Sequence, residues 1–93
     1  MSVAFAVGSG VLPEGAAESL RRLAATRGGR DIQVVGHGES PASDAATQAA
    51  TLALAFARAR GMATVLVQAG VPANAIRLTA EAIGRGGVAR VVE

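Results

Sequence analysis

Cysteine, tryptophan, tyrosine and lysine are all absent from this sequence of 93 residues, and two phenylalanines are its only aromatic residues. Without cysteine the chain can form neither a disulfide framework nor a thiolate metal site, and a single histidine cannot build a zinc site. The scarcity of aromatic rings also removes the stacking platforms on which single-stranded nucleic acids bind. We therefore expect no metal, no cofactor and no nucleic-acid partner.

The charged residues are few and unusual in kind, because all nine basic residues are arginine. An isoelectric point of about 11.1 is typical of a nucleic-acid-binding protein, yet the formal net charge is only +2. Since lysine, tyrosine and cysteine are missing, almost nothing loses a proton above neutral pH until arginine does. The high isoelectric point therefore reflects missing titratable groups and does not indicate a polyanionic partner.

Hydrophobic residues make up 51% of the chain, which is too apolar for a disordered protein. No apolar stretch reaches the ~18 residues that a membrane-spanning helix needs, so we expect no membrane insertion by this domain. The length suits one domain over residues 1–93. Because the first apolar run begins so close to Met1, we also expect this domain to be part of a longer protein.

Residue spacing predicts the order strand, helix, strand, helix, strand, strand. Gly70 followed by Pro72 marks the end of a long second helix. Ser43 and Asp44 are its candidate N-caps, and Gly61 inside it is a candidate kink. The predicted strands are residues 3–7, 31–37, 75–80 and 88–92, the last two joined by a glycine turn, and the predicted helices are residues 13–27 and 44–69.

Arg58 is unusual because it lies at the centre of the apolar stripe of the predicted long helix. At about 100° per residue, Leu54 and Met62 lie within about 40° of Arg58, whereas Arg60 points away into water. A buried unpaired charge costs several kcal/mol, and Glu39, after the preceding strand, is the nearest candidate partner. Three interpretations stay open: an internal ion pair, an arginine that extends to water, or an opposite-charge pair in a cleft for a zwitterionic ligand such as an amino acid or peptide end.

Three motifs follow one another along the chain. Residues 32–40 read Ile-Gln-Val-Val-Gly-His-Gly-Glu-Ser, residues 54–59 read Leu-Ala-Phe-Ala-Arg-Ala, and residues 70–73 read Gly-Val-Pro-Ala. In order and spacing they resemble the OmpA-like peptidoglycan-binding domain, whose pattern is a strand ending Gly-His-Thr-Asp, a helix with Leu-Ser-x-x-Arg-Ala and a Gly-Val or Gly-Ile turn. The resemblance covers essentially the whole chain. It implies an α/β (α+β) two-layer sandwich of order β-α-β-α-β-β, with the helices on one face of a mixed sheet.

The resemblance also implies a function. Domains of this family are non-catalytic and hold the bacterial cell envelope to peptidoglycan, in the periplasm or at the outer membrane, by binding the diaminopimelate of the stem peptide. The Asp and the Arg that bind this group correspond to Glu39 and Arg58. Nearby, Gly38 replaces the family's Thr, Thr51 stands where Asn is preferred, and Asp44, in a longer connection, is an alternative acid to Glu39.

A degenerate domain that has lost peptidoglycan binding and serves protein–protein interaction is the alternative. It rests on the outer face of the long helix, where Phe56, Ala63 and Val67 add apolar surface that suits a homodimer unless the first helix covers it. An enzyme is disfavoured, since residues 8–10, Gly-Ser-Gly, lack the rest of a phosphate-binding motif. His37 has no nucleophile partner identifiable from spacing, so we expect it to be a structural residue at the end of its strand.

Overall fold

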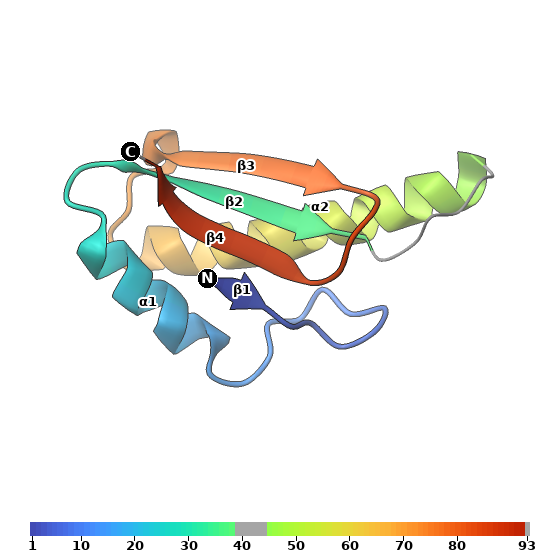
Figure 1. The fold of residues 1–93 in the computed structure, drawn as a ribbon, viewed down its shortest axis with the longest axis horizontal. Coiled ribbons are helices and arrows are strands. Elements are labelled where there is room, and N and C mark those ends of the chain that lie inside the picture. The colour runs from blue at the N-terminus through green and yellow to red at the C-terminus, as the bar shows by residue number, and fades with distance from the viewer. Residues whose placement is uncertain (39–44, 93) are drawn as a thin grey trace.

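The strand β2 (Asp31–His37) lies in the middle of the sheet, with neighbours on both of its edges. The computed structural model describes residues 1–38 and 45–92, and of residues 45–48 it describes the backbone alone. The other elements, in chain order, are β1 (Ser2–Val3), α1 (Ala16–Thr26), α2 (Ala45–Gln68), the short 3-10 helix η1 (Ala73–Ala75), β3 (Ile76–Glu81) and β4 (Gly87–Val92). The sheet order is β1-β4-β2-β3 (Figure 1).

The sheet is mixed, as predicted. Val34 of β2 lies beside Leu78 in the parallel neighbour β3 and beside Ala89 in the antiparallel neighbour β4. The predicted glycine turn does join β3 to β4, but the two strands do not form a hairpin. Instead the chain crosses the end of β2, where the His37 N–H donates to the Gly86 carbonyl at 3.0 Å. Alternating hydrophobicity identifies a strand, whereas its partner depends on which neighbour buries its apolar face.

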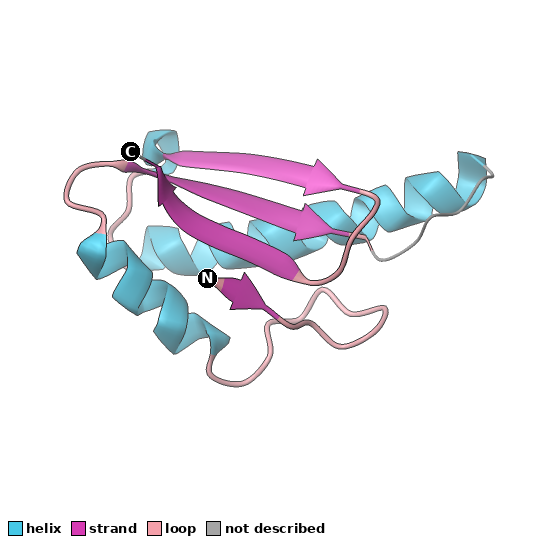
Figure 2. Ribbon diagram, in the orientation of Figure 1, coloured by secondary structure: helices cyan, strands magenta, loops and turns pink. Residues whose placement is uncertain are grey.

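Both helices pack on one face of the sheet, which confirms the expected two-layer sandwich (Figure 2). Ile32 and Val34, alternate residues of β2, are completely buried. Leu20 of α1 and Met62 of α2 belong to the same core cluster and are equally buried. Each such side chain contributes about 1.5–3 kcal/mol on leaving water.

The N-terminal segment differs from the sequence prediction. The strand β1 ends at Val3 instead of residue 7, and α1 begins at Ala16 instead of Pro13. Gly15, the N-cap of α1, has a φ of 84°, which a right-handed helix does not accommodate. Residues 4–15 therefore form a long loop, and this loop supplies contacts to the candidate site.

The helix α2 is continuous over 24 residues and ends within one residue of its predicted end. Its expected N-caps, Ser43 and Asp44, lie outside the described residues. Gly61 does not interrupt the helix. The helix stops just before Gly70, whose φ is 102°. The long helix is thus predicted correctly from its pattern and its glycine stop.

The expectation that no apolar stretch is long enough to cross a membrane is wrong. Residues 49–68 have a mean hydropathy of 1.4 and are long and apolar enough to cross a membrane, by length and composition only. Counting the run as broken at Arg58 and Arg60 missed this stretch, whose mean hydropathy stays high with both arginines included. In the fold α2 packs against β2, β3 and β4, which is the place of a core helix.

Candidate functional site

Arg58 of α2 is completely buried, in the middle of the helix face that packs on the sheet. Ala55, Ala59 and Met62, its neighbours on that face, are also completely buried, whereas Arg60 is exposed. The prediction that Arg58 lies within the apolar stripe is therefore confirmed. The interpretation of an arginine that extends to water is wrong, because the side chain has no exposed surface.

The guanidinium of Arg58 donates hydrogen bonds to backbone carbonyls from two separate segments. Nε donates to the Ser9 carbonyl at 2.9 Å and Nη2 to the Ala6 carbonyl at 3.0 Å, both in the loop after β1. Nη1 donates to the His37 carbonyl at 2.8 Å, at the end of β2. The planar fork of an arginine is suited to such divergent acceptors, and a lysine ammonium is not.

Phe5 completes this arrangement from the side. The ring of Phe5 is buried, and the Arg58 Cζ atom lies 5.1 Å from its centroid, within the range of a cation–π contact. Sequence reasoning identified Arg58 but missed Phe5 and the carbonyls as its partners. Every residue has a backbone carbonyl, so no sequence pattern identifies the carbonyls that Arg58 contacts. Phe5, one of two aromatic residues, is the partner that the sequence could have suggested.

Two glycines of β2 and its extension allow α2 to approach the sheet closely. A Cβ atom on Gly36 would collide with the Ala55 carbonyl oxygen and would lie 2.7 Å from the Ala59 nitrogen. A Cβ atom on Gly38 would collide with the Thr51 carbonyl oxygen. The family's Thr cannot be accommodated at position 38 of this chain without moving α2, which explains the glycine there.

The structure brings three of the five expected ligand-binding residues together. Gly38, Thr51 and Arg58 lie where the end of β2 meets α2, and the Gly38 N–H donates to the Glu81 carbonyl at 2.9 Å. Glu39 and Asp44 lie outside the described residues. Both the ion pair between Glu39 and Arg58 and their joint cleft therefore stay predictions.

His37 makes contacts that fit its expected structural role. Its Nδ1 atom lies 2.9 Å from the Ile83 carbonyl oxygen, and because a carbonyl can only accept, Nδ1–H is the donor. The same atom lies 3.6 Å from Oε2 of Glu81. Gly84, with a φ of 103°, sits so close to the ring that a Cβ atom there would be 2.6 Å from Nδ1. The ring thus holds the turn between β3 and β4 against the end of β2.

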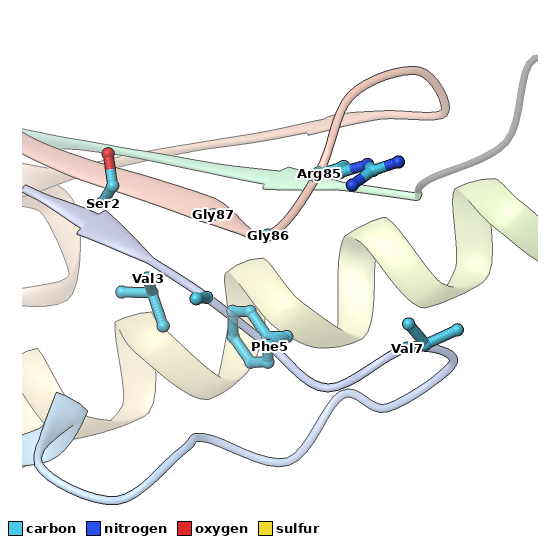
Figure 3. A pocket seen from close by; sticks show the side chains of 8 residues that line it. Ser2, Val3, Phe5, Val7, Arg85, Gly86 and Gly87 are labelled. Atoms are coloured by element: carbon cyan, nitrogen blue, oxygen red, sulfur yellow. The ribbon is translucent and has the colours of Figure 1, made fainter.

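A hollow of about 650 Å³, which no sequence motif predicts, lies beside β1. Figure 3 shows Phe5 and Val7 on one side of it and Arg85, in the turn before β4, on the other. Arg58 does not line this hollow, although its guanidinium contacts the Phe5 ring that does. Its lining comes from two segments far apart in the sequence, residues 2–7 and residues 85–87, which is why no local motif indicates it.

The outer face of α2 remains partly uncovered. Phe56 is 48% exposed and Val67 is 47% exposed, so α1 does not bury them, although α1 contacts α2 elsewhere. The Cζ atom of Arg60 lies 5.9 Å from the Phe56 ring centroid and shields one side of the ring.

Comparisons with known proteins agree with this geometry. The model of the OmpA family matches residues 4–91. The fold is similar to the OmpA-like domain of FopA1 from Francisella tularensis, with a TM-score of 0.74 and 13% identity over 99% of this chain and 72% of that one.

Two further solved structures are similar. The peptidoglycan-associated lipoprotein from Burkholderia pseudomallei has a TM-score of 0.75 and 18% identity, over 98% of this chain and 87% of that one. The C-terminal domain of MotB from Helicobacter pylori has a TM-score of 0.74 and 16% identity, over 100% of this chain and 84% of that one. A comparison with curated proteins found no match. At these identities the structural likeness establishes the fold.

Proposed function

Because the chain belongs to the OmpA family, we propose that it is a non-catalytic module that anchors an envelope protein to peptidoglycan. In this proposal residues 1–93 are one domain of a longer protein located in the cell envelope. A similar fold in a protein named peptidoglycan-associated lipoprotein supports the assignment. The observation that carries the proposal is the buried guanidinium of Arg58 beside the end of β2.

The ligand of this module is the diaminopimelate of the stem peptide. Diaminopimelate ends in an ammonium and a carboxylate on one carbon, so a cation and an anion of the protein can hold both groups. Arg58 binds the carboxylate, and Glu39 binds the ammonium. Gly38 and Thr51, beside Arg58, belong to the same proposed site, and Asp44 is the alternative acid to Glu39.

Access to Arg58 requires the loop between β1 and α1 to move. Ala6 and Ser9, whose carbonyls accept from the guanidinium, flank Val7, which is 92% exposed. A carboxylate brings a full negative charge and can accept two parallel hydrogen bonds from a guanidinium, which a neutral carbonyl cannot, so it displaces these acceptors. Residues 6–9 act in this proposal as a cover that the ligand carboxylate replaces.

Glu39→Gln tests the proposal while leaving Arg58 and its described contacts in place. Glu39→Gln removes the charge and is expected to weaken retention on purified peptidoglycan by about tenfold or more, because a hydrogen bond to a charged group contributes about 1.5–3 kcal/mol. Glu39→Asp, which restores the family's residue, is expected to bind within a few-fold of the wild type. Binding is measured by co-sedimentation with peptidoglycan.

Peptidoglycan that carries lysine in place of diaminopimelate is the matched control, because lysine lacks the second carboxylate. Weak retention on the lysine form and strong retention on the diaminopimelate form support the assigned ligand. Asp44→Asn, measured beside Glu39→Gln, identifies which acid holds the ammonium. Wild-type retention by the double variant Glu39→Gln/Asp44→Asn would contradict the proposed site.

A second candidate function is favoured by the exposed outer face of α2, where a partner or a second copy would cover Phe56 and Val67. Phe56→Ser is then expected to abolish association, since a half-exposed aromatic ring is a large share of such an interface. Val7→Ser, which also removes an exposed apolar side chain, is the control and should have no effect. A monomer in sedimentation analysis at every concentration would leave this candidate without support.

A further inference from the structure

β3 forms one edge of the four-stranded sheet, since β2 is its only neighbour in the sheet order of the described residues. An edge strand presents a row of N–H and C=O groups that can pair with another strand. Residues 76–81 contain neither proline nor glycine, two residues that commonly prevent such pairing. This edge is therefore able to accept a further strand.

The pairing with β2 determines which backbone groups of β3 point outward. The Glu81 carbonyl accepts from the Gly38 N–H, so the backbone groups of Glu81 point toward β2. Because direction alternates along a strand, Arg77 and Thr79 also point their backbone groups toward β2. The N–H and C=O groups of Leu78 and Ala80 therefore point away from the sheet.

The side chains of this edge include one positive and one negative charge, at equal distances along the strand from its midpoint. Arg77 and Glu81 are 61% and 56% exposed on the face of the sheet opposite the helices. Arg77 is held there by Asp31, 3.0 Å from its Nη2 atom, and Glu81 lies 3.6 Å from the Nδ1 atom of His37. Thr79 lies midway between Arg77 and Glu81.

We propose that this edge is a self-association surface, on which β3 of a second copy pairs antiparallel about a two-fold axis at Thr79. In that register the outward N–H and C=O groups of Leu78 form hydrogen bonds with those of Ala80 in the second copy. Arg77 lies opposite Glu81 of the second copy, and the symmetry repeats the pair. Opposite charges in directly facing positions stabilise an antiparallel pair.

Neighbouring registers lack this complementarity. A slip of one residue would turn the outward N–H and C=O groups of one strand away from those of the other. The nearest alternative registers therefore differ by two residues. A slip of two residues one way places Arg77 opposite Thr79, and a slip the other way places Glu81 opposite Thr79. The charges of β3 therefore select the register centred on Thr79.

A groove beside the edge adds apolar surface to the same interface. It has a volume of about 290 Å³ and lies between α2 and Leu78 of β3, with Ala63 and Val67 among the α2 residues that line it. Val67 is about half exposed. Pairing at β3 extends the sheet across the two-fold axis and brings the second copy over this groove, so strand pairing and apolar burial act together. This surface does not include Arg58, although it adjoins the proposed peptidoglycan site where the Glu81 carbonyl accepts from the Gly38 N–H.

Charge reversal tests the pairing and its register. The wild type is expected to show a concentration-dependent dimer in sedimentation equilibrium. Arg77→Glu places like charges opposite each other twice, as does Glu81→Arg, so each variant alone is expected to dimerise at least about tenfold more weakly. An equimolar mixture of the two variants places a glutamate opposite an arginine at both positions, and it is expected to regain dimerisation.

Arg90→Glu is the control for the general effect of charge. Arg90 is exposed on the same face, where its Nε atom donates to Gln33 at 2.7 Å, but it belongs to β4, away from the β3 edge. Arg90→Glu is therefore expected to leave dimerisation unchanged. A wild type that stays monomeric, a dimer that persists in Arg77→Glu and Glu81→Arg, a mixture that fails to restore it, or a dimer lost only in Phe56→Ser would each overturn the proposal.

Discussion

Replacing Arg58 with leucine is expected to lower the free energy of unfolding by about 3–5 kcal/mol, which is a large share of the about 5–15 kcal/mol that stabilises a small domain. Leucine fills part of the space but donates no hydrogen bond. The carbonyls of Ala6, Ser9 and His37 would lose the donors that they now have at 2.8–3.0 Å. The loop after β1 would also lose its tie to α2.

Denaturant unfolding followed by circular dichroism measures this effect. Arg60→Leu is the matched control, because Arg60 is exposed on the same helix, and it is expected to change the free energy of unfolding by less than about 0.5 kcal/mol. Arg58→Lys keeps the charge but not the fork, so it should fall between the two. If Arg58→Leu unfolded at the wild-type denaturant concentration, the carbonyl contacts would have no structural role.

Replacing Gly36 with alanine is the second change with a large expected effect, a loss of about 3 kcal/mol or more. The new Cβ atom would meet the Ala55 carbonyl oxygen and the Ala59 nitrogen, which belong to the backbone of α2. Neither backbone atom can avoid the new Cβ atom by a change of rotamer, as the end of a flexible side chain can. The whole helix must move from β2, and the packing of Ile32 and Val34 loosens with it.

Gly61→Ala is the matched control, since it makes the same chemical change inside α2. The Cβ atom at position 61 would have the Gly10 carbonyl oxygen as its nearest neighbour, at 3.7 Å, which is ordinary contact. Alanine is the better helix former, so the free energy of unfolding should rise by about 0.5–1 kcal/mol. Thermal and denaturant unfolding of both variants provide the comparison, and equal stability of Gly36→Ala and the wild type would refute the close approach.

The two changes test different consequences of one arrangement, the close packing of α2 on β2. Gly36 lets the helix backbone reach the strand, and Arg58 uses that proximity to reach the His37 carbonyl from the helix. A destabilised Arg58 variant would also lose peptidoglycan. For that reason Glu39 and Asp44, and not Arg58, carry the test of ligand binding.

The sequence by itself determined the order of the strands and the two α-helices, and the core face of the long helix. β2 was predicted with its observed bounds, because alternation and flanking glycines indicate a strand locally. Helical spacing placed Arg58 in the apolar stripe without any knowledge of the sheet. The motifs around Gly38 and Arg58 indicated the family, which matches over residues 4–91.

Only the tertiary structure decided what these elements contact. The glycine turn between β3 and β4 is local, but the insertion of β2 between them is not, because strand pairing depends on residues far apart in the chain. Likewise β1 ends early because the loop after it satisfies Arg58 with its carbonyls, and backbone carbonyls are identical at every residue. A sequence can therefore show that a buried arginine needs partners, while the fold determines which backbone groups become those partners.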